Sequence, residues 1–229
     1  MNNTEANWRK VYLIYIDMYT HKKQYITTGA VGTDARAALI MLHGRGAAAE
    51  DIVRLSSVLH TDSLKIYAPQ ATNRSWYPYS FMADDEQNQP ALASALEVLN
   101  DLVNDVNQDG ISTDRIYFLG FSQGACLALE YIARYPARYA GVIAFTGGLI
   151  GKTLSPGKYA GNLIKTPVLI TTGVPDEHVP FSRVEETVKI LEDMNAEVTL
   201  KVFKGRRHTI INEEITLAND IILKNALSK

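Results

Sequence analysis

The segment Gly120-Phe121-Ser122-Gln123-Gly124 lies between an apolar run at residues 115–119 and helix-forming residues at 125–130. This G-x-S-x-G pattern therefore stands at the junction of a predicted strand and a predicted helix, the context in which the pattern has chemical meaning. Glycine on both sides of the serine removes the Cβ atoms that would collide as strand and helix crowd together. We predict a sharp turn that exposes the Ser122 hydroxyl beside the positive N-terminal end of a helix.

Length and charge restrict the class of protein. The chain has 229 residues, 23 basic and 25 acidic residues, and a net charge of −2. This length fits one α/β domain with a sizeable core. Because acids and bases are interspersed, we expect neither a nucleic-acid-binding face nor a polybasic membrane patch. The only cysteine, Cys126, cannot form an intramolecular disulfide, and we expect it to face the core of the helix after Ser122.

The first 20 residues differ from the rest of the chain. A short apolar run at 11–16 follows Arg9 and Lys10 but is interrupted by Asp17. The run is too short to span a bilayer, and no small-residue cleavage site follows it. We interpret residues 1–20 as an added strand or a leader, residues 21–229 as a single domain, and the protein as cytoplasmic without stable membrane insertion.

Strand-like and helix-like segments alternate from about residue 25. The predicted strands are 38–42, 64–68, 115–119, 141–145, 168–172 and 197–203. The predicted helices are 47–59, 91–106, 123–135, 181–194 and 211–227. Continuous apolar strands between amphipathic helices indicate a mostly parallel, twisted sheet with helices on both faces. In such sheets ligands bind at the carboxyl ends of the strands.

A serine nucleophile needs a base, which a third group orients. Enzymes with a serine at such a turn have the chain order serine, acid, histidine. Of the five histidines, only His178 and His208 follow a suitable acid. His208 is favoured because it lies in the loop after the last predicted strand, at the same sheet edge as Ser122. We expect His43 to be structural and His178 to be an ordinary loop residue.

The candidate acid is Asp176, which follows the predicted strand at 168–172. Glu177 is adjacent and is the alternative. The acid would hold His208 in the correct tautomer and stabilise the imidazolium without taking the proton.

Two backbone N–H groups are the candidate oxyanion donors. One belongs to Gln123, the residue after the nucleophile. The other belongs to Arg45, in the glycine-containing loop Leu42-His43-Gly44-Arg45-Gly46 after the first predicted strand. We expect the Arg45 side chain to be solvated, near enough to the site for a contact at its rim.

Four features together resemble the carboxylesterase/phospholipase family of α/β-hydrolases, which includes acyl-protein thioesterases and small bacterial esterases. They are Leu-His-Gly-Arg-Gly, Gly-Phe-Ser-Gln-Gly-Ala, the Gly-x-x-Asp-x-x-Val-Pro pattern at 173–180, and a late loop histidine. The resemblance covers about residues 25–225 and implies an α/β-hydrolase fold. It implies a triad of Ser122, Asp176 and His208, with an oxyanion hole from Arg45 and Gln123. Two departures are Arg207, where many relatives have glycine, and the additional residues 1–20.

Aromatic residues in the loop after the strand at 64–68 suggest a substrate pocket. Trp76 and Tyr77 are the candidate wall residues, with packing of a satellite core as the alternative. The connection at 147–166 is polar and glycine-rich, so we expect a minimal lid and a fairly open site. That site suits small-molecule esters or thioesters with short to medium acyl chains.

The sequence predicts no cofactor and no metal site, and it is compatible with a homodimer. The sequence leaves two alternative functions. A dienelactone-hydrolase-like enzyme would carry cysteine where this chain has Ser122. A non-catalytic binding protein of the same fold would be expected to lack one of the three triad residues, all of which are present.

Overall fold

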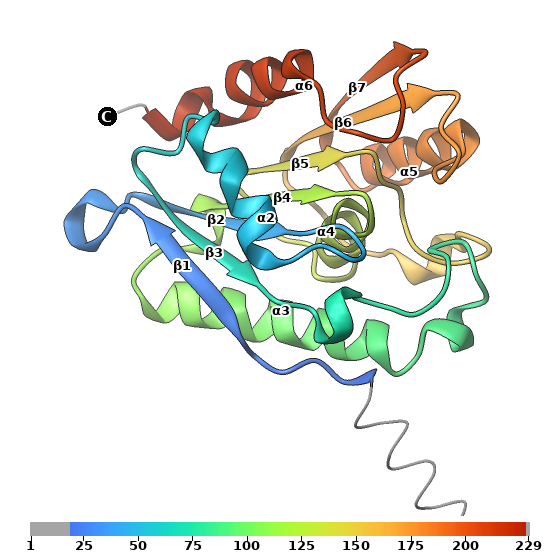
Figure 1. The fold of residues 1–229 in the computed structure, drawn as a ribbon, viewed down its shortest axis with the longest axis horizontal. Coiled ribbons are helices and arrows are strands. Elements are labelled where there is room, and N and C mark those ends of the chain that lie inside the picture. Colours follow the sequence, from blue (N-terminus) through green and yellow to red (C-terminus); the bar gives the residue numbers. More distant parts are fainter. Residues whose placement is uncertain (1–18, 228–229) are drawn as a thin grey trace, which may run out of the picture.

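The computed structural model describes residues 19–227, which form one seven-stranded sheet flanked by helices (Figure 1). The strands are β1 (Tyr25–Gly29), β2 (Ala37–Leu42), β3 (Leu64–Pro69), β4 (Ile116–Phe121), β5 (Gly141–Phe145), β6 (Pro167–Val174) and β7 (Glu197–Lys204). The helices are α2 (Ala49–Val53), α3 (Ala91–Gln108), α4 (Gln123–Arg134), α5 (Phe181–Asp193) and α6 (Asn212–Leu217).

The strand order is β1-β3-β2-β4-β5-β6-β7. All neighbouring pairs are parallel except β1 with β3, which is antiparallel. This confirms the prediction of a mostly parallel sheet. The carboxyl ends of the central strands are level, because Phe121 pairs with Phe145 and Phe145 pairs with Thr171. The loops after β4, β5 and β6 therefore emerge at one edge of the sheet.

Strand β1 was not predicted. Its sequence YITTG has little apolar character, and its last three residues are exposed. A strand at the sheet edge needs only one packed face and one partner, so the apolar run that reveals a central strand is missing. The added strand considered for the first 20 residues lies almost entirely outside the described residues.

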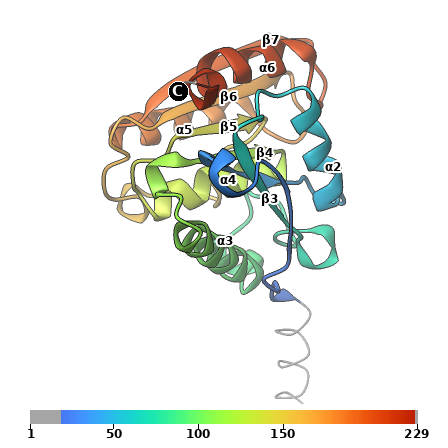
Figure 2. The same ribbon diagram turned by 90° about the vertical axis from the view of Figure 1, so that its left-hand side faces the viewer.

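The helices form two layers, one on each face of the sheet (Figure 2). One buried cluster packs α3, α4 and α5 against one set of alternating strand side chains, among them Ile40 and Phe118. The second cluster packs α2 and the C-terminal helical segment against the opposite set, among them Leu39 and Leu119. The alternation along β2 and β4 confirms that both faces of the sheet are covered.

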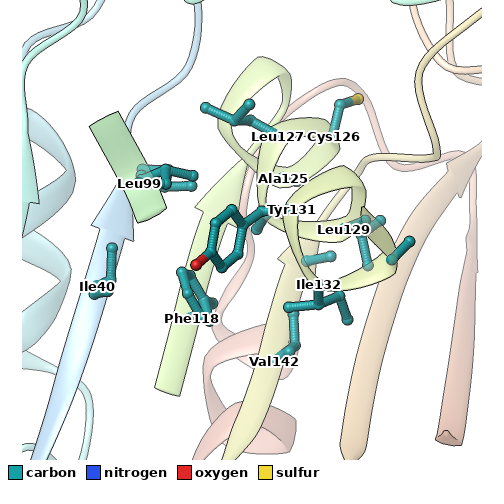
Figure 3. Packing of buried hydrophobic residues seen from close by; sticks show 14 of the residues in the cluster. Ile40, Leu99, Phe118, Ala125, Cys126, Leu127, Leu129, Tyr131, Ile132 and Val142 are labelled. Carbon is teal, nitrogen blue, oxygen red and sulfur yellow. The ribbon is translucent and has the colours of Figure 1, made fainter. Parts of the chain in front are cut away.

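Helix α4 is the most deeply buried helix segment near the sheet centre. Figure 3 shows its side chains, including Leu129 and Ile132, packed beside Phe118 of β4 and Val142 of β5. Cys126 is buried in the same helix, as predicted. Burial of its thiol raises the pKa of Cys126 to about 11, so the thiol stays protonated at neutral pH.

Two predicted helices are shorter or less regular than expected. The segment predicted as a helix at 47–59 contains α2 followed by a 3-10 turn at Arg54–Ser57, where the Ser57 hydroxyl donates to the Arg54 carbonyl at 2.8 Å. Such bonds from serine to nearby backbone compete with helix continuation. The segment at 211–227 contains α6, a π turn at Ala218–Ile222 and a 3-10 turn. There the Asn219 side chain bonds to the backbone of Val58 and His60. Within residues 19–227, no helix combines the length and hydropathy needed to cross a membrane.

Candidate active site

Ser122 occupies a strained turn between β4 and α4. Its φ and ψ are 54° and −118°, a conformation that costs a non-glycine residue about 1–3 kcal/mol. Its N–H donates to the Phe145 carbonyl on β5 at 3.0 Å, which fixes the turn to the neighbouring strand. A Cβ at Gly120 would collide with the Gly124 carbonyl, and a Cβ at Gly124 would collide with the Leu42 carbonyl. Both glycines of the pattern are therefore required by close backbone contacts.

The structure brings Ser122, His208 and Asp176 into one hydrogen-bonded chain. The His208 Nε2 atom lies 2.8 Å from the Ser122 Oγ atom. On the other side of the ring, Nδ1 lies 3.0 Å and 3.2 Å from the two carboxylate oxygens of Asp176. The three residues follow β4, β7 and β6 respectively. This arrangement allows the imidazole to accept the hydroxyl proton of Ser122.

The environment of Asp176 favours its ionised form. Burial alone would raise the pKa of this carboxyl group. The hydrogen bond to His208 and the bonds from the backbone N–H groups of His178 and Val179 outweigh burial, so the pKa of Asp176 is lowered. The alternative acid, Glu177, is exposed and lies 3.5 Å from His178 instead.

His43 is a structural residue and His178 is a loop residue, as expected. His43 is fully buried, and its Nδ1 atom lies 2.8 Å from the Gly44 carbonyl. His178 is in the loop after β6, where its ring lies edge-on to His208 with centroids 4.7 Å apart. His178 thus lines the site. Among the described residues, no hydrogen bond joins its side chain to the Ser122 hydroxyl.

Two backbone N–H groups next to Ser122 have no protein acceptor among the described residues. They belong to Arg45 and Gln123, the predicted oxyanion donors. The loop of Arg45 is close to the serine, because a Cβ on Gly44 would lie 3.6 Å from the Ser122 Cβ. The buried Gln123 side chain accepts from the Trp76 N–H at 2.9 Å and donates to the Tyr77 carbonyl at 2.8 Å.

The Arg45 side chain is exposed, as expected. Its guanidinium also donates to the carbonyl groups of Pro78 and Tyr79 at 2.7 Å and 2.5 Å and to the Ser75 hydroxyl at 3.2 Å. These bonds to the loop after β3 hold the exposed guanidinium at the rim of the cavity.

A cavity of about 480 Å³ opens beside Ser122 and His208. Tyr77 lines it, in agreement with the sequence-based prediction. Trp76 does not, so its prediction as a wall residue needs correction. The Trp76 side chain is 0% exposed, lies between His21 and His43, and donates from Nε1 to the His43 carbonyl at 2.9 Å. The polar indole N–H finds this buried acceptor beneath the loop of Arg45, so Trp76 packs under the site.

Phe81 also lines the cavity, and it belongs to the aromatic loop that the sequence suggested as the wall of a pocket. Other lining residues were not identified from the sequence, among them Val179, Cys126 and His178. Val179 belongs to the loop that follows β6, and its position after a parallel strand was the available signal. Cys126 lies one helical turn after Ser122, on the same side of α4, and that spacing was its signal. Within residues 19–227, His, Cys, Asp and Glu side chains form no group of three or more that could hold a metal ion.

Comparison with known proteins agrees with this geometry. The phospholipase/carboxylesterase family model matches residues 24–226. The crystal structure of a phospholipase/carboxylesterase from Dyadobacter fermentans is 58% identical, covers 90% of this chain and 99% of its own, and superposes with a TM-score of 0.88.

Two curated proteins are more distant relatives. A probable carboxylesterase SOBER1-like protein of Arabidopsis thaliana is 24% identical over 79% of this chain and 76% of its own length. Acyl-protein thioesterase 1 of Kluyveromyces lactis is 27% identical over 79% of this chain and 88% of its own length. The resemblance inferred from the motifs is confirmed: the chain belongs to the phospholipase/carboxylesterase family of α/β-hydrolases and is a hydrolase that acts on ester bonds.

Proposed function

We propose that the protein hydrolyses carboxylic esters, and thioesters of similar size, through an acyl-enzyme on Ser122. The observation that carries this proposal is the hydrogen-bonded chain from Ser122 through His208 to Asp176, next to the N–H groups of Arg45 and Gln123, which lack an acceptor in the described part of the protein. The chain supplies an activated nucleophile, and the N–H groups supply donors for negative charge on the substrate oxygen.

In the first half of the reaction, Ser122 Oγ attacks the carbonyl carbon while His208 Nε2 takes its proton. The oxygen of the tetrahedral intermediate becomes negative and accepts hydrogen bonds from the two N–H groups. Asp176 remains ionised and stabilises the imidazolium. Collapse of the intermediate breaks the bond to the alcohol or thiol, which leaves with the proton from His208, and the acyl group stays on Ser122.

In the second half, water attacks the acyl-enzyme. His208 removes a proton from this water, and the same donors stabilise the second tetrahedral intermediate. Its collapse releases the carboxylic acid and returns the proton to Ser122. No cofactor is needed for either half, because both use only proton transfer and charge stabilisation.

The cavity supports substrates of short to medium size. It is bordered by the loop after β3, which Arg45 holds through Pro78 and Tyr79. The connection between β5 and β6 contains a 3-10 turn at Pro156–Lys158 and no longer helix, so it provides no bulky lid. These features favour small-molecule esters that enter an open site. The buried, unpaired Cys126 supports a reducing, cytoplasmic location for this activity.

The dienelactone-hydrolase alternative is less well supported, because the residue at the turn is a serine and the one thiol nearby is buried with a raised pKa. A non-catalytic binding protein is disfavoured by the presence of a complete triad with hydrogen-bonding geometry.

A fluorophosphonate probe and two variants test the proposal. The probe should label the wild type at Ser122 and should not label Ser122→Ala. Ser122→Ala should keep its melting temperature within a few degrees and should lose about 10⁴- to 10⁶-fold in kcat on p-nitrophenyl esters, because the triad acts as a unit. Cys126→Ser is the matched control on the same helix and should retain labelling. Labelling that persists in Ser122→Ala would contradict the proposed nucleophile.

A further inference from the structure

Arg45 lies in the wall of the cavity with part of its hydrogen-bonding capacity unused. A guanidinium has five N–H donors in a fixed plane. Nη1 donates to Ser75 and Pro78, and Nη2 donates once, to Tyr79. The Nε–H and one N–H of Nη2 remain without an acceptor among the residues that the structure describes. These two nitrogens form one edge of the guanidinium, the arrangement that binds a carboxylate through two parallel hydrogen bonds.

The charge of Arg45 is not neutralised within the described part of the chain. No carboxylate of residues 19–227 lies within ion-pair distance of it, and none lines the cavity. Asp176 is bonded to the His208 ring and does not line the cavity.

Two other acids in the loop after β3 form ion pairs with lysines. Asp84 pairs with Lys152 at 3.1 Å, and Asp85 pairs with Lys158 at 3.0 Å. Among the residues that line the cavity, Arg45 carries a positive charge and none carries a carboxylate.

We propose that the preferred ester substrate also carries a carboxylate, and that the Arg45 guanidinium binds this carboxylate while Ser122 attacks the ester carbon. This inference rests on the proposed function, and it adds the substrate class. The three bonds to Ser75, Pro78 and Tyr79 fix the guanidinium in advance, so little side-chain freedom is lost when the carboxylate binds.

The position of Arg45 limits the size of the substrate. Its backbone N–H would bind the developing oxyanion, and its side chain would bind the carboxylate. The two substrate groups must then lie within the span of one arginine side chain. Small dicarboxylic monoesters, or esters of small hydroxy acids or phenolic acids, meet this requirement. A long neutral acyl chain does not use the guanidinium.

Two isosteric pairs of esters test the inference. In the first pair, 4-acetoxybenzoate and 4-acetoxybenzamide, the carboxylate or its neutral amide is on the alcohol side. In the second pair, monoethyl adipate and ethyl adipamate, it is on the acyl side. The measured quantity is the ratio of kcat/KM for acid over amide within each pair. A charged two-point contact gives an expected ratio of about tenfold to hundredfold in at least one pair. The same ratio should fall as NaCl is raised from 0.05 to 0.5 M.

Variants then assign the preference to Arg45. Arg45→Met should bring the ratio to about one or below, and Arg45→Lys should keep a smaller ratio because it retains charge but not the two-point geometry. Both variants also lose the contacts to the loop after β3, so absolute rates fall, and the ratio isolates the carboxylate contact. Arg54→Met removes an equal charge at an exposed position, whose one ion pair within residues 19–227 is with Asp51, and it should keep the wild-type ratio.

The outcomes separate this inference from the proposed function. Ratios at or below one in both wild-type pairs overturn the carboxylate preference, with no variant needed. A ratio above one that survives in Arg45→Met overturns the assignment to Arg45. If the ester bonds of 4-acetoxybenzamide and ethyl adipamate are not hydrolysed, and the fluorophosphonate does not label the protein, the proposed function itself is contradicted.

Discussion

Arg206 and Glu214 form a buried ion pair beneath the His208 loop, with 3.5 Å between Nη2 and Oε1 and side chains that are 3% and 0% exposed. Arg206 Nη1 donates to the carbonyl oxygens of Arg207 and Thr209, each at 2.8 Å, on either side of His208. The Glu214 carboxylate accepts from the Ile211 N–H at 2.9 Å and from the Thr171 hydroxyl on β6. The pair thus holds the loop that places the imidazole.

Loss of one member of this pair should be costly. Removing one partner leaves the other charge buried without compensation, which typically costs about 3–5 kcal/mol. We expect Arg206→Met and Glu214→Ala each to lower the free energy of unfolding by that amount in urea titrations. Lys189→Met is the control, because its pair with Asp193 is 76% and 66% exposed and should contribute less than about 1 kcal/mol. Equal losses in Arg206→Met and Lys189→Met would contradict the role given to the buried pair.

Trp76 should affect stability without changing substrate preference. Trp76→Phe keeps most of the buried aromatic volume but leaves the His43 carbonyl without its Nε1–H donor. An unsatisfied buried acceptor costs about 1–3 kcal/mol, which urea titration can resolve. Because Trp76 does not line the cavity, the order of kcat/KM along a series of p-nitrophenyl esters should stay as in the wild type. A shift of the preferred chain length in Trp76→Phe would restore the original interpretation of Trp76 as a wall residue.

Phe81 is the matched position inside the cavity. Phe81→Ala removes a large apolar surface from the lining and should move the preferred ester towards longer or bulkier groups. Since one methylene in such a pocket changes discrimination by about 1–3 kcal/mol, the shift should be graded along the series. An unchanged profile in Phe81→Ala would show that the cavity does not hold the varied part of the ester.

The sequence predicts features that depend on local packing, but not the directions of side chains in loops. The central strands and the Ser122 turn were predictable because continuous apolar runs and paired glycines report local packing and backbone crowding. The proximity of Ser122, Asp176 and His208 could be predicted because strand order places Asp176 and His208 at the sheet edge of Ser122. In contrast, the direction of a side chain within a loop depends on tertiary contacts. No sequence pattern indicates the burial of Trp76 or the contacts of Arg45 with the loop after β3.

The buried role of Arg206 was hidden for the same reason. Arg207 departs from the family pattern, whereas its neighbour Arg206 forms the buried contacts. An arginine is expected at the surface unless a buried acidic partner is known. Glu214 lies eight residues further along the chain, in a first helical turn where acids are common for reasons of the helix dipole.

The connection between β5 and β6 should not act as an interfacial lid. The fully buried Glu130 on α4 accepts hydrogen bonds from the Ile150 N–H and the Tyr159 hydroxyl, both at 2.9 Å. The Gly151 N–H also donates to the Phe81 carbonyl at 2.7 Å. Opening this connection would leave the Glu130 carboxylate buried with fewer partners.

Hydrolysis of a partly soluble ester such as tributyrin should therefore follow simple saturation through the solubility limit. Rates measured by pH-stat on either side of that limit provide the test. An abrupt rise in rate when droplets form would show that the connection moves. Glu130→Gln, which weakens the contacts, is the variant in which such a rise is most expected.

Stability should decrease in mild acid because the half-buried His21 and the buried His43 serve as hydrogen-bond acceptors. His21 Nδ1 accepts from the Thr72 N–H at 3.0 Å, and its Nε2 lies 3.0 Å from the Trp76 carbonyl. His43 Nε2 accepts from the Ala71 N–H at 3.2 Å. Protonation would replace each acceptor by a second N–H. Burial lowers the pKa of both His21 and His43 below the usual value of 6.5.

The sign of the pH effect follows from these lowered pKa values. Below about pH 6.5 the unfolded chain binds protons at these histidines that the folded chain does not bind, so acid favours unfolding. The stabilising contribution is complete above that pH and declines as the pH falls towards the folded-state values. We expect the urea midpoint at pH 5.5 to be lower than at pH 7.5, and His21→Gln to reduce this difference, because glutamine does not titrate. A urea midpoint that is equal at the two pH values in the wild type, or a difference unchanged in both His21→Gln and His43→Gln, would contradict the assignment of acid sensitivity to these two imidazoles.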